Sequence, residues 1–157
     1  MSPHVTSLQI GRPLFVLICI VLALPFVGRG EEGRPIVSSF TAREIGGDVP
    51  SWTTLQDEQG LLYFGCEQVI TFDGETWRKY PVPGSYAVRG LAFGANGRLW
   101  VGAVNEIGYF DRTEKGLSEF HSLVNFLPET ERELGDLWQV FAQGSKGAVF
   151  ILSLIHI

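Results

Sequence analysis

From Ser51 onward, short apolar runs alternate with turn residues, and this pattern predicts a series of short β-strands. The sequence Asp73-Gly74 predicts a tight hairpin, because glycine and aspartate tolerate the left-handed backbone that such turns require. A further turn is predicted at Asp57–Gly60. The first group of runs therefore predicts four strands, at Trp52–Gln56, Leu61–Cys66, Val69–Phe72 and Thr76–Val82.

The same pattern starts again twice, after the turn residues that end the first group. The second group predicts strands at Val88–Phe93, Arg98–Val104, Glu106–Asp111 and Leu117–Leu123, with a turn at Gly94–Gly97. The third predicts strands at Trp138–Gln143 and Ala148–Leu152, joined by a turn at Gly144–Gly147. Between these two groups, residues 124–136 predict an acidic loop with one helical turn around Glu129–Leu134.

A local motif repeats at the second strand of each group: a glycine, one free position, an aliphatic residue, an aromatic residue and a further apolar residue. It is Gly60-Leu61-Leu62-Tyr63-Phe64 in the first copy, Gly97-Arg98-Leu99-Trp100-Val101 in the second and Gly147-Ala148-Val149-Phe150-Ile151 in the third. Self-similarity at this spacing is typical of stacked structural units. We expect the aromatic residue of each copy to pack against the next sheet.

Four short strands in each repeat predict an all-β fold. A single sheet of this kind cannot cover both of its apolar faces, and radial stacking of such sheets gives a β-propeller of about four to eight blades. The sequence predicts an incomplete β-propeller of about two and a half four-stranded antiparallel blades over residues 51–152, with copies at 51–83, 88–123 and 138–152.

The N-terminal thirty residues have a different character. Arg12 precedes an uncharged apolar run, Leu14–Leu24, and small residues including Gly28 and Gly30 follow. This order predicts a signal peptide over residues 1–30 with a hydrophobic signal helix; the alternative is an uncleaved signal anchor. Residues 31–50 predict a linker or an approach strand. Residues 153–157 resemble a non-native adaptor read-through, the alternative being an authentic strand.

Charge and cysteine content narrow the range of functions. The formal net charge is -5, and no block of Lys and Arg is present, which argues against nucleic-acid binding. Cys19 lies in the export segment, so Cys66 has no partner for an intrachain disulfide in the exported part. A small buried residue is the favoured interpretation of Cys66.

The repeats resemble the two-component regulator propeller family, whose repeat runs hydrophobic-x-x-Asp-x-x-Gly-x-Leu-Trp-hydrophobic-Gly and ends in an aromatic-Asp pair. The matching text is Leu55–Gly65 with Phe72-Asp73, and Leu91–Gly102 with Phe110-Asp111. Gly94 stands where the pattern prefers aspartate. The resemblance covers about residues 50–152.

This resemblance implies a non-catalytic, ligand-sensing segment of a membrane-linked signal-transduction regulator. Members are extracytoplasmic, commonly followed by a three-tyrosine domain, a membrane helix and a cytoplasmic histidine kinase, diguanylate cyclase or DNA-binding output. The implied location is periplasmic and tethered to the inner membrane, with a homodimer as one assembly. The implied ligand is unidentified, an oligosaccharide in some members. No family ligand residue lies in a motif that this sequence matches, and no cofactor is implied.

Few residues suggest chemistry. His121 lacks the partners of a metal site or proton relay, so a surface or structural role is favoured. An acidic cluster lacks the spacing and turn glycine of a calcium loop and is interpreted as a solvated loop: Glu129, Glu131, Glu133 and Asp136. Turn roles are favoured over glycoside hydrolysis for Asp57, Asp73 and Asp111. We therefore predict no catalytic, cofactor or metal residue.

The tryptophans are the remaining candidates, since an exposed indole can stack on a sugar. They are Trp52, Trp77, Trp100 and Trp138. Trp100 is expected to pack between sheets. For Trp77 and Trp138, contact with a ligand stays open as an alternative to packing. Two other functions stay open: a secreted carbohydrate-active propeller enzyme, which would need acidic, His or Tyr residues converging on a central channel, and an interaction scaffold, against which the export segment argues.

Overall fold

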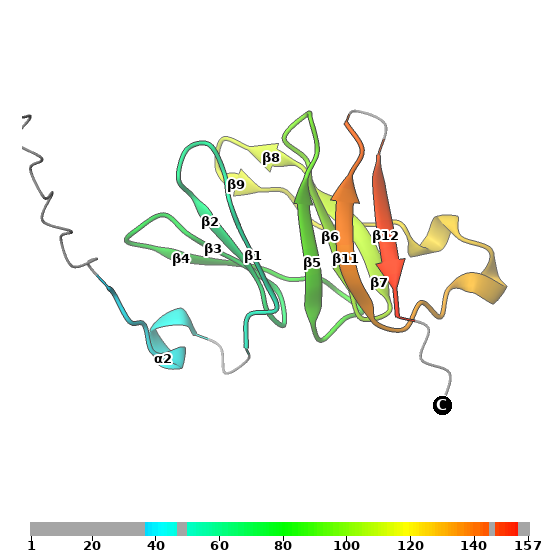
Figure 1. The fold of residues 1–157 in the computed structure, drawn as a ribbon, viewed down its shortest axis with the longest axis horizontal. Coiled ribbons are helices and arrows are strands. Elements are labelled where there is room, and N and C mark those ends of the chain that lie inside the picture. Colours follow the sequence, from blue (N-terminus) through cyan, green and yellow to red (C-terminus); the bar gives the residue numbers. More distant parts are fainter. Residues whose placement is uncertain (1–36, 47–49, 145–146, 154–157) are drawn as a thin grey trace, which may run out of the picture. The chain divides into compact units, whose positions relative to one another are not determined.

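The computed structural model describes residues 37–46, 50–144 and 147–153 (Figure 1). The chain divides into two compact units, residues 1–38 and 39–157, and every helix and strand that is described belongs to the second. The predicted signal segment, residues 1–30, lies outside the described residues. Within the described ranges, no helix has the length and apolar character that crossing a bilayer requires.

The first repeat forms one antiparallel sheet, as predicted. Its strands are β1 (Thr53–Gln56), β2 (Leu62–Gly65), β3 (Val69–Phe72) and β4 (Trp77–Tyr80), paired in the order β1-β2-β3-β4. The Asp73-Gly74 hairpin forms between β3 and β4, with Gly74 at φ +102°. All four predicted strands of this copy are confirmed; β3 has the predicted bounds and the other three are shorter.

The second repeat also forms a four-stranded sheet, in the order β10-β7-β6-β5. Its strands are β5 (Val88–Phe93), β6 (Leu99–Ala103), β7 (Glu106–Phe110) and β10 (His121–Ser122). The predicted strand Leu117–Leu123 is wrong over its first half. Gly116, at φ +124°, closes a separate hairpin of β8 (Arg112–Thr113) and β9 (Gly116–Leu117), so only β10 remains to pair with β7 (Figure 1).

The third repeat is a two-stranded hairpin of β11 (Leu137–Ala142) and β12 (Ala148–Leu152), as predicted. The acidic loop before it carries two short 3-10 helices, Val124–Phe126 and Glu129–Glu131. The expected helical turn around Glu129–Leu134 is therefore present in tighter form and is confined to its first three residues.

A helix lies where a linker or approach strand was expected. Helix α2 (Ala42–Ile45) begins after Thr41, whose side chain accepts a hydrogen bond from the Glu44 amide while the Glu44 carboxylate accepts from the Thr41 amide. This capping box stabilises the helix start, and Gly46, at φ +75°, ends the helix. Just before it, Phe40 packs edge-on against Phe72 and Trp77 of the first sheet, with ring centroids 5.0 and 5.3 Å apart.

The sheets stack in sequence order. Side chains alternate between the two faces of a strand, so Tyr63 and Gly65 share one face of the first sheet, and Leu62 and Phe64 share the other. We call the face of each sheet that is turned toward the following repeat its front face, and the opposite one its back face. On the front face of the first sheet Tyr63 is 1% exposed, and its ring lies 5.0 Å from that of Phe93 in β5.

The core of the molecule lies at this contact. Tyr63 joins one buried cluster with back-face residues of the second sheet, among them Leu91, Leu99, Val101 and Phe110. The expectation that Tyr63 packs against the next sheet is confirmed.

The third copy is out of register with the motif by one residue. Phe93 pairs with Leu99 in the second copy, whereas Ala142 pairs with Ala148 in the third, so residues correspond at an offset of 49 rather than 50. A one-residue shift reverses the face of every side chain in a strand. Phe150 therefore lies on the back face, where its ring is 6.4 Å from that of Trp100 in the preceding sheet. The expectation that Phe150 packs against a following sheet is wrong.

Candidate functional site

At the first strands of the three repeats, three equivalent positions, one from each repeat, lie close together. Strands β1, β5 and β11 are neighbours in space (Figure 1). Residues of the first and second copies correspond at an offset of 37, and those of the second and third at 49. Trp52, Arg89 and Trp138 therefore occupy the same place in their repeats.

A β-bulge marks this place in the second and third copies. The pairing register shifts between Val88 and Gly90 in β5 and between Leu137 and Gln139 in β11, so Arg89 and Trp138 are the extra residues. A bulge re-aims the side chain of its extra residue. Arg89 and Trp138 consequently depart from the pleat of their own sheets, and both side chains meet Trp52, which lies just before β1.

The convergence is an arginine between two indoles. The guanidinium carbon of Arg89 lies 3.6 Å from the ring centroid of Trp52 and 4.9 Å from that of Trp138. The two indoles are 6.4 Å apart and nearly perpendicular. An arginine over the face of a tryptophan is stabilised by about 0.5–2 kcal/mol, the larger value applying when water is excluded.

The site is open on its indole side. Trp52 and Trp138 are each 45% exposed, whereas the Arg89 side chain is 11% exposed. A pocket of about 260 Å³ is formed by these residues together with Thr53, Gly90, Leu91, Gln139, Val140 and Phe141. Half-exposed indoles beside a pocket can stack on the flat apolar face of a small molecule.

Arg89 forms an ion pair with Asp136, but their buried atoms are not hydrogen-bonded to any described residue. Nε and Nη1 of Arg89 and Oδ1 of Asp136 are buried and accept or donate no hydrogen bond there. The Nη2 atom of Arg89 is 3.7 Å from the same Asp136 oxygen, too long for a hydrogen bond.

From the sequence alone, all four tryptophans are candidates, with Trp77 and Trp138 left open, and Arg89 is not singled out. The other two tryptophans, Trp77 and Trp100, pack against aromatic neighbours, and Trp77 also borders a pocket of about 340 Å³ next to α2. Trp77 stacks on Phe72 at 4.2 Å, and Trp100 packs edge-on against Tyr109 at 5.4 Å, in addition to its contact with Phe150. The inter-sheet role expected for Trp100 is confirmed.

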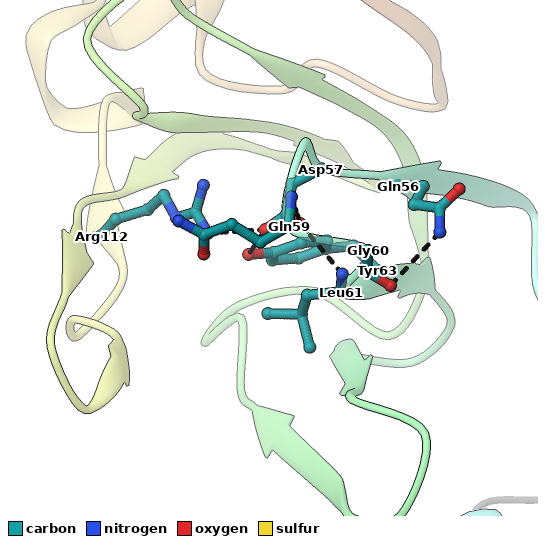
Figure 2. A network of polar contacts seen from close by, with 7 residues as sticks. All are labelled: Gln56, Asp57, Gln59, Gly60, Leu61, Tyr63 and Arg112. Atoms are coloured by element: carbon teal, nitrogen blue, oxygen red, sulfur yellow. Dashed lines mark hydrogen bonds and ion pairs between the residues drawn. The ribbon is translucent and has the colours of Figure 1, made fainter.

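Asp57 and Asp73 hold turns, as predicted. Oδ1 of Asp57 accepts hydrogen bonds from the amides of Gln59 and Leu61, each at 2.9 Å (Figure 2). Oδ1 of Asp73 accepts from the amides of Glu75 and Thr76, and these bonds hold the pKa of the Asp73 carboxyl below its ordinary value.

Asp57 also reaches beyond its turn. Its Oδ2 atom accepts from Nη2 of Arg112 at 2.6 Å and from the Tyr63 hydroxyl at 3.2 Å (Figure 2). Burial, assisted by the Asp57 charge, raises the pKa of Tyr63 to about 12. Arg112 belongs to β8, so this network joins the first repeat to the second.

Asp111 departs from its expected turn role. Its Oδ1 atom accepts from Nε of Arg98 at 2.8 Å, and the Arg98 guanidinium also lies over the Tyr109 ring at 3.7 Å. The Asp111 carboxylate thus forms an ion pair between the residue that follows β7 and the residue that precedes β6. No two of these three aspartates face each other across a cleft as unengaged carboxylates.

The remaining candidate residues, His121 and Cys66, are in contacts that suit packing roles. His121 is exposed and stacks on Tyr109 with ring centroids 4.9 Å apart. Cys66 is buried, as predicted, and burial raises the pKa of its thiol. In the part of the chain that the structure describes, no three His, Cys, Asp or Glu side chains are grouped closely enough to hold a metal ion.

Comparisons with known proteins give no relative: no family model, no curated protein and no solved structure matches this chain.

Proposed function

We propose that the chain is the ligand-sensing propeller segment of an extracytoplasmic, membrane-linked signal-transduction regulator, and that this segment is non-catalytic. The observation that carries the proposal is the convergence of Trp52, Arg89 and Trp138 from equivalent positions of three repeats. Ligand sites in stacked-sheet proteins commonly lie where the repeats meet, because each repeat can then contribute a side chain to one site.

The proposed ligand is an oligosaccharide. Two half-exposed indoles, Trp52 and Trp138, would stack on the apolar faces of its rings. Because Trp52, Arg89 and Trp138 come from different repeats, binding would favour one arrangement of the sheets over others. We propose that this change in sheet packing is the signal, and that it is passed to an output domain.

The engaged aspartates support a non-catalytic segment. Glycoside hydrolysis requires two carboxyl groups facing a bond across a cleft. Asp57 and Asp73 are bonded to backbone amides of their turns, and Asp111 is paired with Arg98.

The proposal is tested by titrating the full chain with a panel of oligosaccharides while following tryptophan fluorescence. A binding oligosaccharide should change the emission of the wild type, and Trp138→Ala and Arg89→Met should each weaken binding by at least about tenfold, the equivalent of one lost contact. Trp100→Phe is the matched control, because its indole packs between sheets, and it should bind as the wild type does. Equal binding by Trp138→Ala, Arg89→Met and wild type would reject this site.

A further inference from the structure

Glu106 is a buried carboxyl group with no ion-pair partner among the described residues. It is the first residue of β7 and is 7% exposed. Its Oε1 atom accepts a hydrogen bond from the Ser122 hydroxyl at 2.7 Å and one from the Ile107 amide at 3.1 Å. These two bonds replace only part of the hydration that an ionised carboxylate loses on burial, so the pKa of Glu106 is raised above its ordinary value.

The elements around Glu106 do not pair a charge with it. Their charged and titratable groups are Tyr86 in segment 82–87, Arg89 in β5, His121 in β10, and Glu129, Glu131, Arg132, Glu133 and Asp136 in the segment that follows β10. Arg89 pairs with Asp136, and Arg132 donates to backbone carbonyls of its own segment. His121 stacks on Tyr109, on the face of β10 opposite to Ser122. The hydrogen bonds to the buried carboxyl therefore come from neutral donors alone.

Glu106 also lies where both ends of a surface loop, residues 123–135, are attached. The loop leaves β10 at Ser122, which donates to Glu106, and the next amide donates to the backbone of β7 at 2.8 Å. At the other end, the Asn105 amide donates to the Gly135 carbonyl at 2.8 Å, and the Gly135 amide donates to Oδ1 of Asn105 at 2.7 Å. Two consecutive residues thus hold the loop, one through a titratable group and the other through neutral amides.

Between these two ends the loop is weakly held. None of its residues is buried, and Phe126 is 83% exposed. Neither of its two 3-10 helices has a side-chain cap. Strand β10, which leads into the loop, pairs with β7 over only two residues. Segments with so few buried contacts open locally at a much smaller free-energy cost than global unfolding.

We propose that Glu106 is a pH-sensitive latch on loop 123–135. The neutral carboxyl holds β10 and the start of the loop on β7, and ionisation of the carboxyl releases them, with the bonds between Asn105 and Gly135 as the hinge. Release brings water to the carboxylate and so removes the cost of the buried charge. Unfolding of the whole chain would give the same hydration only by exposing the core cluster as well.

The direction of the pH response follows from the two states of the latch. In the released state Glu106 is hydrated and has its ordinary pKa, whereas in the closed state the pKa is raised. The population of the released state therefore grows as pH rises from the ordinary value to the raised one, by up to about tenfold per pH unit, and is constant outside this window.

The test is hydrogen exchange of the full chain, followed amide by amide by NMR from acidic to neutral pH, with each rate divided by its intrinsic rate at that pH. The Leu123 amide, bonded to the Ile107 carbonyl, reports the latch, and the Gly135 amide reports the hinge. The amides of the β2–β3 pair report global unfolding. Leu123 should be less protected than the β2–β3 pair at every pH, and should lose protection as pH rises more steeply than Gly135 does.

Two variants assign the response to one carboxyl. In Glu106→Gln, the Leu123 amide should show no change of protection with pH, because the group that titrates is gone. Glu129→Gln is the matched control: it makes the same chemical change at an exposed position of the loop, and it should keep the wild-type response. The comparison of Leu123 with Gly135 and the β2–β3 pair in the wild type stands even if circular dichroism shows that Glu106→Gln is unfolded.

Wild-type protection of Leu123 that is constant over this pH range would overturn the latch. So would a Leu123 amide as well protected as the β2–β3 pair, since its exchange would then need global unfolding. An equal pH response at Gly135, or a response that Glu106→Gln retains, would overturn it as well.

Discussion

At the scale of single residues, Asp57 and Gly94 illustrate how the repeats compensate for one another's differences. They occupy equivalent positions, 37 residues apart. Asp57 accepts a hydrogen bond from the aromatic residue of its own copy, Tyr63. Gly94 instead leaves room for the larger indole of Trp100, since a Cβ there would lie 2.9 Å from the indole Nε1. The first copy thus combines an aspartate with a tyrosine, and the second combines a glycine with a tryptophan. Both copies keep the turn.

We expect Asp57→Ala to lower the free energy of unfolding by about 2–4 kcal/mol, because it leaves two turn amides, the Tyr63 hydroxyl and Arg112 without their acceptor. The measurement is urea unfolding at neutral pH. Asp73→Ala is the matched control: it also removes an aspartate from a turn, but this side chain is exposed, and a smaller loss of stability is expected. Equal losses of unfolding free energy in the two variants would show that the contacts of Asp57 with Tyr63 and Arg112 contribute no stability beyond that of the turn.

Glu106 gives a prediction for pH. This residue is 7% exposed; burial raises the pKa of its carboxyl above the ordinary value, although bonds from the Ser122 hydroxyl and the Ile107 amide act in the opposite direction. The folded state therefore holds a proton that the unfolded state has already released, so Glu106 contributes most to stability at acidic pH. That contribution is lost as pH rises from the ordinary carboxyl pKa through the raised one.

In Glu106→Gln the amide oxygen can accept the same two bonds without a charge. We expect the difference in unfolding free energy between this variant and the wild type to grow in favour of the variant as pH rises through that window. Unfolding by urea at a series of pH values from acidic to neutral measures it. A constant difference between the two proteins would contradict the shift.

At the scale of elements, close approach between sheets depends on positions without a side chain. Gly65 is one, because an added Cβ would meet both the Val88 carbonyl and the side chain of Thr53. The backbone carbonyl belongs to the next sheet and cannot move aside as a flexible side chain would. The first two sheets can approach this closely only because β2 ends in glycine.

Gly65→Ala should therefore destabilise the protein by about 1–3 kcal/mol, the usual cost of overpacking a well-packed core. Thr54→Ala, an exposed position on the neighbouring strand β1, should change stability by less than about 0.5 kcal/mol. Thermal unfolding followed by circular dichroism compares the two. A Gly65→Ala protein as stable as Thr54→Ala would mean that the sheets do not approach at this point.

Strands could be predicted from the sequence because their signals are local. The Asp73-Gly74 hairpin and the glycine that ends each β-turn fix where chains reverse, and alternating apolar residues mark the strands between them. Local signals fail where pairing decides. Nothing within Leu117–Leu123 reveals that Leu117 pairs with Arg112 in the β8–β9 hairpin. Likewise, the sequence of the third repeat does not reveal that its strands pair one residue out of register with the motif. The capping box of α2 was a local signal, but its helix is too short to show an apolar period.

At the scale of the whole molecule, the candidate site exists only because repeats are adjacent. Trp52 and Trp138 attracted attention as tryptophans, whereas Arg89 lies in an ordinary strand pattern. The offset of 37 residues that relates the first two copies leads from Trp52 to Arg89, so the repeat itself carried the missing signal. The third member could not be placed in this way, since the motif glycines give an offset of 50 where the strands pair at 49.

The central claim is that consecutive repeats pack with their first strands adjacent, so that equivalent positions meet. A double-mutant cycle on Trp52→Leu and Arg89→Met, measured by urea unfolding, tests it most directly, because these two side chains are in direct contact and come from different repeats. We expect the double variant to differ from the sum of the single variants by about 0.5–2 kcal/mol, while the control pair Asp73→Ala and Arg89→Met is additive. Additivity of Trp52 and Arg89 as well would contradict the stacking of the repeats.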